Sequence, residues 1–317
     1  MKLVTFLLDN QERIGAAVEG AAGRVIDLHR AYASYLRDVE STPNAEQLAS
    51  AVLGRDMVEF LKRGEIALQA ARKALAHAEI NPRDDYIVER QRVRLMAPVP
   101  RPGALVSAGK NFSDHVSEMS SKKGPSDPVA FLKVPGSVIG PEDDIPHPPE
   151  VTNLDYEVEL AVVIGKPCID VTVNEALDYV AGYSAFNDIS ARDVIRGENK
   201  TGIHLMGKSF PGFAPMGPYL VTADEIPDPQ RLKLWLRVNG ETRQDSNLGY
   251  MIFKIRDMIA YWSRMGLNPG DVLTTGTPRG VAAGRKPDQT PWWLKPGDLV
   301  EAEVESIGRL KNRVVAE

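Results

Sequence analysis

Three closely spaced prolines interrupt the chain near residue 100 and limit what can form there. Pro98, Pro100 and Pro102 all fall within the sequence APVPRPG. Because proline lacks a backbone N–H and has a fixed φ angle, this stretch cannot continue a helix or a central strand. We therefore expect a boundary here, with a small N-terminal domain over residues 1–95 and a larger domain over residues 103–317.

The first region has the sequence pattern of a small α+β unit. Short apolar runs over residues 3–28, separated by the turn signals Asp-Asn and Glu-Gly, predict a meander of strands. Further along, Asp56 precedes Glu59 by three residues, which is typical of a capping box, and Gly64 is a typical helix stop. Residues 65–79 then carry apolar side chains at helical spacing. We expect strands followed by helices.

The second region is expected to be mostly β. Glycine and proline turns separate short apolar runs, a pattern that predicts strands. Asn239-Gly240 between two such runs is a hairpin signal. Minor helices are expected near residues 173–181, 190–197 and 253–265. The fold class is therefore α+β and mainly β, with strands expected at the runs ALVSAG, VAFLKV, YEVELAVVIG, LKLWLRV and DVLTTG.

The composition is that of an ordinary soluble globular protein and excludes several other classes. Of its 317 residues, 43% are hydrophobic and 26% are charged, and the net charge is −5. This balance provides no basic surface for nucleic acid, and no apolar run is long enough for a signal peptide or a membrane span. The single cysteine, Cys168, excludes an internal disulfide and a thiolate cluster. We expect a cytoplasmic protein with no nucleic-acid or membrane partner.

Two glutamates in the run DYEVELAVVIG are the first candidates for chemistry. If residues 155–164 form one strand, Glu157 and Glu159 point to the same side and lie about 7 Å apart along it. Hard oxygen ligands at this spacing can bind one divalent cation, whereas the alternative is the solvated face of an antiparallel strand. Asp188, at the end of another predicted strand, is either a third ligand or the cap of a helix beginning near Ser190.

A histidine and a glutamate form a second candidate group. His115 and Glu118 lie three residues apart, so on a helix the carboxylate can orient the imidazole as a general base. The alternative for an isolated pair is a solvated helix face. Taken alone, Arg192 next to Asp193 is typical of a surface ion pair, and Lys208 of a surface lysine. The glycines and the other histidines match no nucleotide-binding or zinc-binding motif.

Eight segments, taken together and in order, resemble the fumarylacetoacetate hydrolase family. The resemblance covers residues 103–317 nearly throughout. Each motif is weak evidence alone, so the resemblance rests on the occurrence of all eight in the same order. Residues 1–95 are similar to the short N-terminal domain of the longer members. The segments are GKNFSDHVSEM, PVAFLKVPGSVIGP, DYEVELAVVIG, GYSAFNDISARD, GKSF with FAPMGPYLVT, VNGE, LNPGDVLTTGTPRGV and LKPGDLVEAEVESIG.

The resemblance implies a fold and a metal site. It implies mixed β-sheets rolled into a distorted barrel, with a Mg²⁺ or Mn²⁺ site at the mouth of the barrel. It also implies a homodimer that acts on a small diketo or oxo acid. The residues that it carries over as metal ligands are Glu157, Glu159 and Asp188.

The same resemblance implies roles for five residues around the metal. His115 and Glu118 match the catalytic dyad, on a segment that often becomes ordered only when ligand binds. Lys208 matches a catalytic lysine beside the metal that also contacts substrate. Arg192 and Thr277 match substrate contacts. A shared site would explain all of these polar positions at once.

These assignments predict a metal-dependent hydrolase that cleaves a carbon–carbon bond in a 1,3-dicarbonyl acid. The substrate would be an acylpyruvate or a fumarylpyruvate-like product of aromatic-compound catabolism. His115 and Glu118 would activate water, and the metal and Lys208 would stabilise the departing enolate. One alternative uses the same enolate in a tautomerase, isomerase or decarboxylase of an oxo-dienoate or β-keto acid. An alternative of another class is a non-catalytic binding paralogue.

The sequence departs from the family pattern at three places near the predicted site. Ile195 replaces a glutamine that many small members have, and Pro211-Gly212 follows the GKSF segment in place of a different sequence. Phe112 replaces the commoner tyrosine and removes a hydroxyl. These changes bear on substrate choice and leave the metal ligands untouched. Residues 112–125, rich in small and polar side chains, are expected to form a mobile lid.

Overall fold

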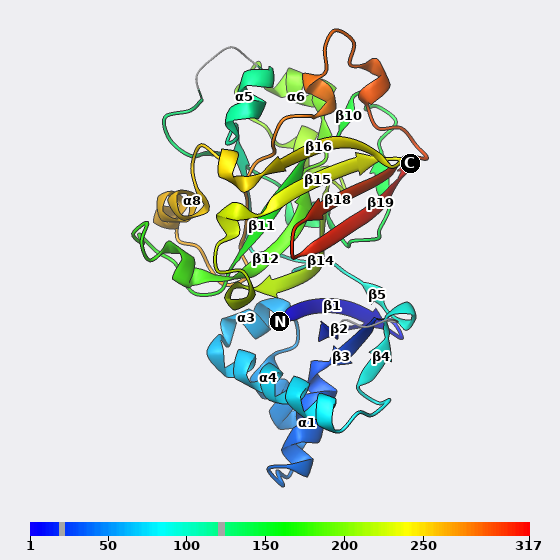
Figure 1. Cartoon of the computed structure of the whole chain (residues 1–317), viewed down its shortest axis with the longest axis vertical. Helices are drawn as coiled ribbons and strands as arrows, with labels where there is room; N and C mark the ends of the chain where they lie inside the picture. The colour runs from blue at the N-terminus through cyan, green and yellow to red at the C-terminus, as the bar shows by residue number, and fades with distance from the viewer. Residues whose placement is uncertain (19–22, 120–123) are drawn as a thin grey trace.

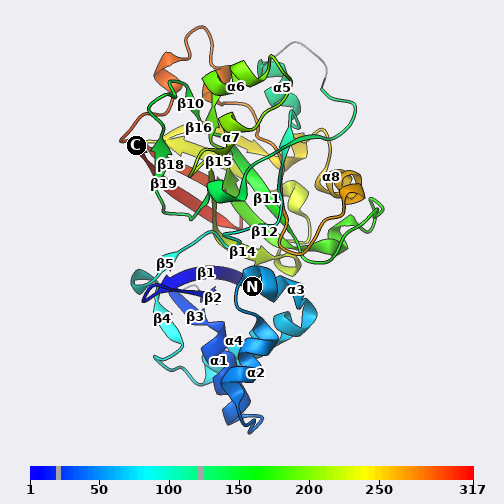
Figure 2. The same ribbon diagram turned by 180° about the vertical axis from the view of Figure 1, so that it is seen from behind.

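The computed structural model of the chain describes residues 1–18, 23–119 and 124–317 (Figure 1). The N-terminal region forms one end of the molecule, and the sheets of the second region form the other end (Figures 1 and 2). The N-terminus lies where the two parts meet (Figure 1). Within the described ranges, none of the helices combines the length and apolar character that crossing a bilayer requires.

In its described part, the N-terminal region is a short antiparallel sheet with four α-helices. The predicted meander is confirmed, because Leu3 pairs with Ala16 between the first two strands and the third follows in antiparallel register. The predicted helix cap is also confirmed, since the Asp56 carboxylate accepts a hydrogen bond from the Glu59 amide at 2.9 Å. The elements are β1 (Lys2–Leu8), β2 (Gln11–Val18), β3 (Arg24–Asp27), α1 (Leu28–Asp38), α2 (Ala45–Leu53), α3 (Met57–Lys62), α4 (Glu65–Ile80), β4 (Ile87–Glu89) and β5 (Arg94–Leu95).

The N-terminal sheet continues into the second region without a break. Strand β1 pairs with β14, so the strand order is β4-β3-β2-β1-β14-β12-β11-β17-β6-β7. Strands β5 and β8 lie off this path and pair with β1 and β14. The strands of the second region in this sheet are β6 (Leu105–Gly109), β7 (Val129–Leu132), β8 (Val138–Ile139), β11 (Val158–Ile164), β12 (Val180–Asn187), β14 (Ala214–Thr222) and β17 (Val272–Thr274).

A second sheet packs against the centre of the first. Its order is β16-β15-β18-β19-β9, and the predicted hairpin at Asn239-Gly240 joins β15 to β16 with both turn residues at positive φ. Strands β15 and β18 contact β11, and β19 contacts β14. The bounds are β9 (Ile145–His147), β15 (Lys233–Val238), β16 (Glu241–Asn247), β18 (Leu299–Val304) and β19 (Gly308–Ala316).

The remaining elements are a small ladder and the helices of the second region. A two-stranded ladder pairs β10 (Leu154–Asp155) with β13 (Ser190–Ala191). Helices α5 and α6 lie near each other at the end of the molecule opposite the N-terminal region (Figures 1 and 2). The helices of the second region are α5 (Ser113–Met119), α6 (Arg192–Glu198), α7 (Met206–Ser209) and α8 (Ile255–Trp262). These mixed sheets with a small N-terminal α+β region confirm the predicted fold class.

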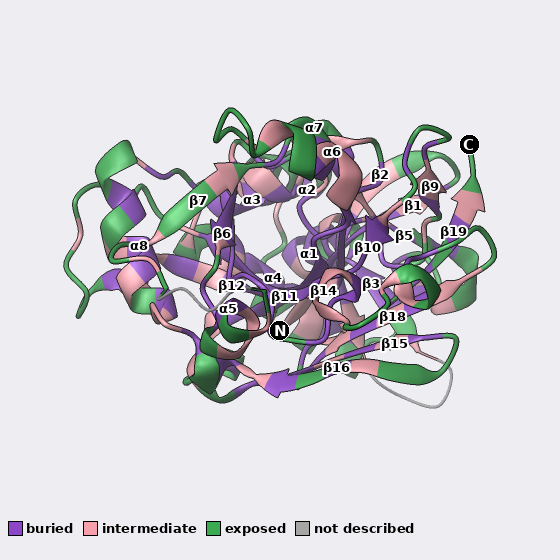
Figure 3. Ribbon diagram, turned by 90° about the horizontal axis from the view of Figure 1, so that it is seen from above, coloured by how far each residue is buried: buried purple, intermediate pink, exposed green. Residues whose placement is uncertain are grey.

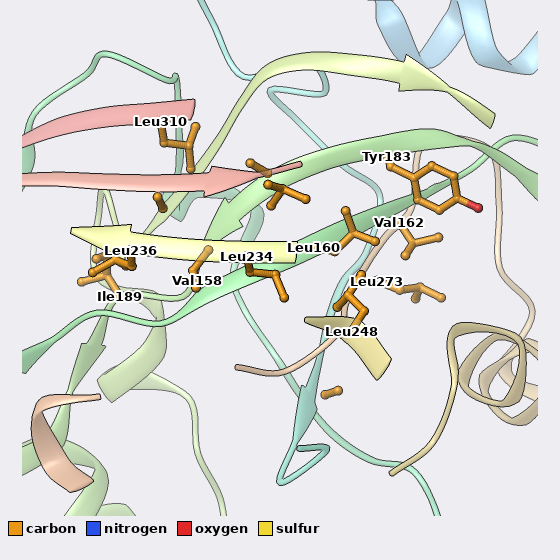
Figure 4. Packing of buried hydrophobic residues seen from close by; sticks show 14 of the residues in the cluster. Val158, Leu160, Val162, Tyr183, Ile189, Leu234, Leu236, Leu248, Leu273 and Leu310 are labelled. Carbon is orange, nitrogen blue, oxygen red and sulfur yellow. The ribbon is translucent and has the colours of Figure 1, made fainter. Parts of the chain in front are cut away.

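Strand β11 is buried on both faces, which explains why Glu159 is its only polar residue. Val158, Leu160 and Val162 face the core between the two sheets (Figure 4). Ala161 and Val163 instead join the core formed with the N-terminal helices. Figure 3 shows the central strands buried, whereas β7 and β16 carry exposed stretches. Because the two regions share a sheet and a core, the division at residues 95 and 103 stays a prediction.

Two expectations about local structure are wrong. Residues 155–164 do not form one strand, because the Asp155 side chain binds the amides of Ala282 and Ala283 at 2.7 and 3.1 Å and ends β10 there. No α-helix forms over residues 173–181, since only a single 3₁₀ turn, Ala176–Tyr179, precedes β12.

The helix expected over residues 190–197 is shifted by two residues. Ser190 and Ala191 pair in β13, and α6 begins only at Arg192. The helix expected over residues 253–265 is shorter, Ile255–Trp262, followed by a 3₁₀ turn. Both helices therefore exist near their predicted positions, with different ends.

Candidate active site

Antiparallel pairing brings the three candidate metal ligands together. Val158 of β11 pairs with Asn187 of β12, so Glu157 and Asp188 lie opposite each other just beyond these strands, and the Asp188 amide binds the Glu157 carbonyl at 2.9 Å. Glu159 points to the same side as Glu157. One carboxylate oxygen from each of the three residues lies within 4.8 Å of the others. The expectation of convergence is confirmed, and all three side chains are buried rather than on a solvated face.

Buried cations hold two of the three carboxylates. The Lys208 ammonium lies 2.8 Å from Glu157 Oε2 and 2.5 Å from Asp188 Oδ2. The Arg192 guanidinium pairs with Glu157 and, at 2.7 Å, with Asp155. The alternatives of a surface lysine, a surface ion pair and a helix-capping aspartate are therefore wrong. The side chain of Asp188 faces the cations, not the start of α6.

The electrostatics differ sharply between the two glutamates. Burial alone would raise the pKa of Glu157, but the charges of Arg192 and Lys208 outweigh burial and hold this pKa well below its usual range. Burial raises the pKa of Glu159 well above its ordinary value, and the negative charges of Asp188 and Glu157 raise it further. Glu159 accepts a hydrogen bond from the Gly276 amide at 2.9 Å but pairs with no cation in the described chain.

This donor set fits a divalent metal ion. Three buried carboxylates offer the hard oxygen ligands that such ions prefer, and ionised Glu159 needs a nearby positive charge to offset its burial. The geometry therefore makes Glu157, Glu159 and Asp188 a candidate metal centre.

Lys133 is a site residue that was not predicted from the sequence. It follows β7 directly, is almost fully buried, and its ammonium lies 2.6 Å from Asp188 Oδ1. It also donates to the main-chain carbonyl of Lys208. Burial lowers the pKa of Lys133, and the Lys208 charge lowers it further, against the opposing charge of Asp188. The signal that could have identified Lys133 in the sequence is a lysine directly after an apolar strand.

The candidate dyad lies on α5, as its spacing predicts. His115 Nδ1 is 3.8 Å from Glu118 Oε2, and both side chains are mostly buried. Burial tends to raise the pKa of Glu118, but contacts with His115 and the Gly280 amide lower it overall. Phe112, just before this helix, is completely buried. Of the predicted lid, residues 120–123 lie outside the described residues.

A backbone cradle holds Glu118 from the opposite side. The Gly280 amide donates to both carboxylate oxygens, at 3.1 and 3.0 Å. The Gly280 carbonyl in turn accepts from the Arg285 guanidinium at 3.2 Å, and this guanidinium also binds the Arg243 carbonyl at 2.8 Å. Both arginines stack on the Trp292 ring, each 4.3 Å from its centroid. The loop after β17 thereby fixes the position of Glu118.

We expect Arg285→Ala to lower turnover about tenfold to a hundredfold, because a small displacement of Glu118 is costly in an active site. Loss of the Gly280 hydrogen bond should also raise the pKa of Glu118. The charged neighbours that lower this pKa, His115 and Arg279, would remain. The acid limb of the pH–rate profile should then move to higher pH. Steady-state kinetics across pH would measure both effects.

Arg313→Ala is the matched control, because Arg313 donates to a glycine carbonyl, that of Gly297, at 3.0 Å on the surface. It should leave the pH profile unchanged. An Arg285→Ala protein that loses stability but keeps the parental pH profile would contradict the link to Glu118.

Most of the candidate residues line one cavity of about 1180 Å³, but Glu118 and Asp188 are not among its lining residues. Thr277 lies at its wall, and its hydroxyl donates to the Val158 carbonyl at 3.0 Å and accepts from Gln244 at 2.9 Å. The polar and charged residues that line the cavity are Lys110, His115, Glu157, Glu159, Arg192, Arg196, Asn199, His204, Lys208, Thr277 and Gln289. The sequence predicted six residues of this set, His115, Glu157, Glu159, Arg192, Lys208 and Thr277, but not the other five, among them Lys110, Arg196 and His204.

The departures from the family pattern fall in two different environments. Ile195 is mostly buried and also lines the cavity, where it gives an apolar wall next to Gly207. Gly212 has φ +80° and lies against the Pro146 ring, so a larger residue would be strained there. Phe112 packs in the core. Of the three, only Ile195 borders the cavity directly.

A comparison with family models shows to which family the chain belongs. The model described as fumarylacetoacetate (FAA) hydrolase C-terminal matches residues 104–315. The chain belongs to the fumarylacetoacetate hydrolase family. Among solved structures, the fumarylacetoacetate hydrolase from Exiguobacterium antarcticum is 34% identical with a TM-score of 0.76, and each chain is covered completely. A 5-carboxymethyl-2-hydroxymuconate delta-isomerase from Mycobacterium smegmatis is 28% identical with a TM-score of 0.73, again over both complete chains.

Curated relatives correct the predicted activity. The Rattus norvegicus protein named oxaloacetate tautomerase Fahd2a, mitochondrial, is 41% identical over 99% of this chain and 92% of its own length. The Homo sapiens protein named oxaloacetate tautomerase FAHD2A, mitochondrial, is 43% identical over 83% of this chain and 81% of its own length. The main expectation of a carbon–carbon bond hydrolase is therefore wrong. The same dyad, lysine and metal ligands are compatible with either reaction, so the residues alone did not separate them.

The chain is an enzyme of this family that acts on a small molecule. The alternative of a non-catalytic binding paralogue is not supported. A homodimer, a cytoplasmic location and a role in aromatic-compound catabolism stay predictions, and the rat and human relatives are named as mitochondrial.

Proposed function

We propose that this protein interconverts the keto and enol forms of a 2-oxo dicarboxylic acid such as oxaloacetate. The observation that carries the proposal is the 41% identity, over nearly the whole chain, to a relative named oxaloacetate tautomerase. The site supports it, because carboxylates able to hold a metal lie in one cavity with a histidine that can move a proton. Tautomerisation was an alternative in the sequence interpretation.

We assign Mg²⁺ or Mn²⁺ to the centre formed by Glu157, Glu159 and Asp188. Both ions prefer oxygen ligands, and all three donors are carboxylates. When bound, the ion would polarise the 2-oxo group and lower the free energy of the enolate. Arg192 and Lys208 keep Glu157 ionised and oriented toward this position.

His115 moves the proton in the proposed reaction. Its Nδ1 faces Glu118, which leaves Nε2 for the substrate. Nε2 takes a proton from carbon 3 and returns it to the oxygen on carbon 2, so that no atom is gained or lost. Glu118 stays ionised because its pKa is lowered, and its charge stabilises the imidazolium formed between the two transfers.

Lys208 stabilises negative charge on the same oxygen. Burial opposes its charge, but Asp188 and Glu157 outweigh burial and raise its pKa. Because its raised pKa keeps the ammonium protonated, Lys208 acts as a hydrogen-bond donor and not as the proton source. Thr277, in the wall of the same cavity, contacts the substrate in this proposal.

The test measures how fast freshly dissolved enol-oxaloacetate converts to the keto form. Purified protein with Mg²⁺ or Mn²⁺ should accelerate the loss of enol absorbance above the buffer rate, while total oxaloacetate stays constant. Chelation should remove the acceleration. If total oxaloacetate falls and pyruvate and CO₂ appear at the enzymatic rate, the activity is decarboxylation and the proposal fails. Decay of the enol at the buffer rate with either metal would also overturn it.

A further inference from the structure

Among the residues that the structure describes, four lysines and arginines line the cavity, and they divide into two pairs. Arg192 and Lys208 are bound to the carboxylates of the candidate metal centre. Lys110 and Arg196 have no carboxylate partner within the described ranges, and Arg196 binds only the neutral amide of Asn153. The second pair can therefore bind an anion without breaking an ion pair.

The backbone of Lys110 is held in a conformation that lysine seldom adopts. Its φ is +55°, in the left-handed region, between the end of β6 and the start of α5. The next residue, Asn111, is buried and secures this turn: its side chain binds the Thr275 carbonyl at 3.0 Å, the Phe253 carbonyl at 3.1 Å and the Phe253 amide at 2.9 Å. Such conformations persist where surrounding contacts fix them, often at ligand sites.

The loop between α6 and α7 faces the same cavity. His204 lies on this loop and is held by the Asn199 side chain. Burial lowers the pKa of His204, and the charges of Lys208, Lys110 and Arg192 lower it further against the charge of Glu198. Lys110, Arg192 and Lys208 therefore act on the space around His204, and Arg196 lines the same cavity, in which His204 can add a hydrogen bond.

We propose that Lys110 and Arg196, with His204 beside them, form a subsite for the second carboxylate of the substrate. The inference rests on the proposed function, which places the 2-oxo acid end at the carboxylate triad. A carboxylate that accepts charge-assisted hydrogen bonds from both cations would be bound strongly and oriented. The subsite would make the enzyme selective for 2-oxo dicarboxylates over 2-oxo monocarboxylates.

Variants at Lys110 test the subsite without disturbing the turn. Lys110→Gly removes the charge and accepts the positive φ, whereas Lys110→Arg keeps the charge. Lys110→Gly and Arg196→Gln should each raise KM for oxaloacetate about tenfold or more, as expected for the loss of a charge-assisted hydrogen bond. The inhibition constant of oxalate, which carries only the metal-chelating end, should change less than about twofold. Lys110→Arg should stay close to the parent.

Lys166→Ala is the matched control, because Lys166 is exposed and follows the far end of β11, away from the cavity. It should leave both constants unchanged. An unchanged KM in Lys110→Gly and Arg196→Gln, or an equal loss of oxalate binding, would overturn the subsite.

A separate measurement keeps the subsite distinguishable from the proposed function. If the parent protein does not tautomerise oxaloacetate, the proposed function fails, and calorimetric binding of oxaloacetate and pyruvate with Mg²⁺ then tests the subsite alone. Tighter binding of oxaloacetate that is lost in Lys110→Gly supports the subsite. Equal affinity of the parent for the two acids overturns it.

Discussion

Glu159→Gln should remove both divalent-metal binding and activity. Glu159 is the one carboxylate of the triad without a cationic partner in the described chain, so its ionised form depends most on the metal. Loss of a charged ligand should weaken Mg²⁺ binding by at least about a hundredfold, more than the loss of an outer-shell contact. Calorimetry with Mg²⁺ and Mn²⁺, alongside enol decay, would measure both losses.

The same variant should leave the metal-free protein equally stable or more stable. A carboxyl group whose pKa is raised on folding costs stability as pH increases from its unfolded pKa toward its folded pKa, and glutamine removes that cost. The parent should gain thermal stability on adding Mg²⁺, and the variant should not. Glu150→Gln, at an exposed glutamate, is the control. A variant that binds metal like the parent would contradict the ligand assignment.

His115→Ala should lower the tautomerase rate by about 10² to 10⁴, the usual contribution of a general acid–base group. Metal binding should survive, because the three carboxylates lie in β11, just before β11 and just after β12, and not in α5. Stopped-flow enol decay gives the rate, and calorimetry gives the metal affinity.

His147→Ala is the control, since His147 lies in β9 and does not line the cavity. Glu118→Gln should give a smaller loss than His115→Ala, because the imidazole remains and only its partner charge is removed. Parental rates in His115→Ala would show that the spacing of His115 and Glu118 reflects only a helix face.

Local patterns predicted the parts of the site that depend on neighbouring residues. Alternation placed Glu157 and Glu159 on one side, and this held although the predicted strand is interrupted after Asp155. Hydrogen bonds that join the Glu157 backbone to the Asn187 side chain and the Asp188 amide, each of 2.9 Å, hold Glu157 beside the start of β11. Helical spacing put His115 and Glu118 on one face of α5.

Contacts between distant segments were not predictable in this way. Lys133 and Asp188 are 55 residues apart, and Arg285 reaches the backbone of residue 243, which is 42 residues away. Neither pair leaves a periodic signal in the sequence. The reaction was also missed for a physical reason: hydrolysis and tautomerisation of these acids share an enolate, so they call for the same metal ligands, lysine and histidine.

The pairing of β1 with β14 has a consequence for the order in which the protein is made. The first strand emerges from the ribosome early, whereas its partner strand lies about two-thirds of the way along the chain, and the Met1 amine and Thr222 that meet there are 221 residues apart. Until β14 appears, one edge of β1 has no partner from the second region, and exposed edges favour association between chains. Folding of the complete sheet is therefore expected late in synthesis and at a slow rate, as long-range pairing entails.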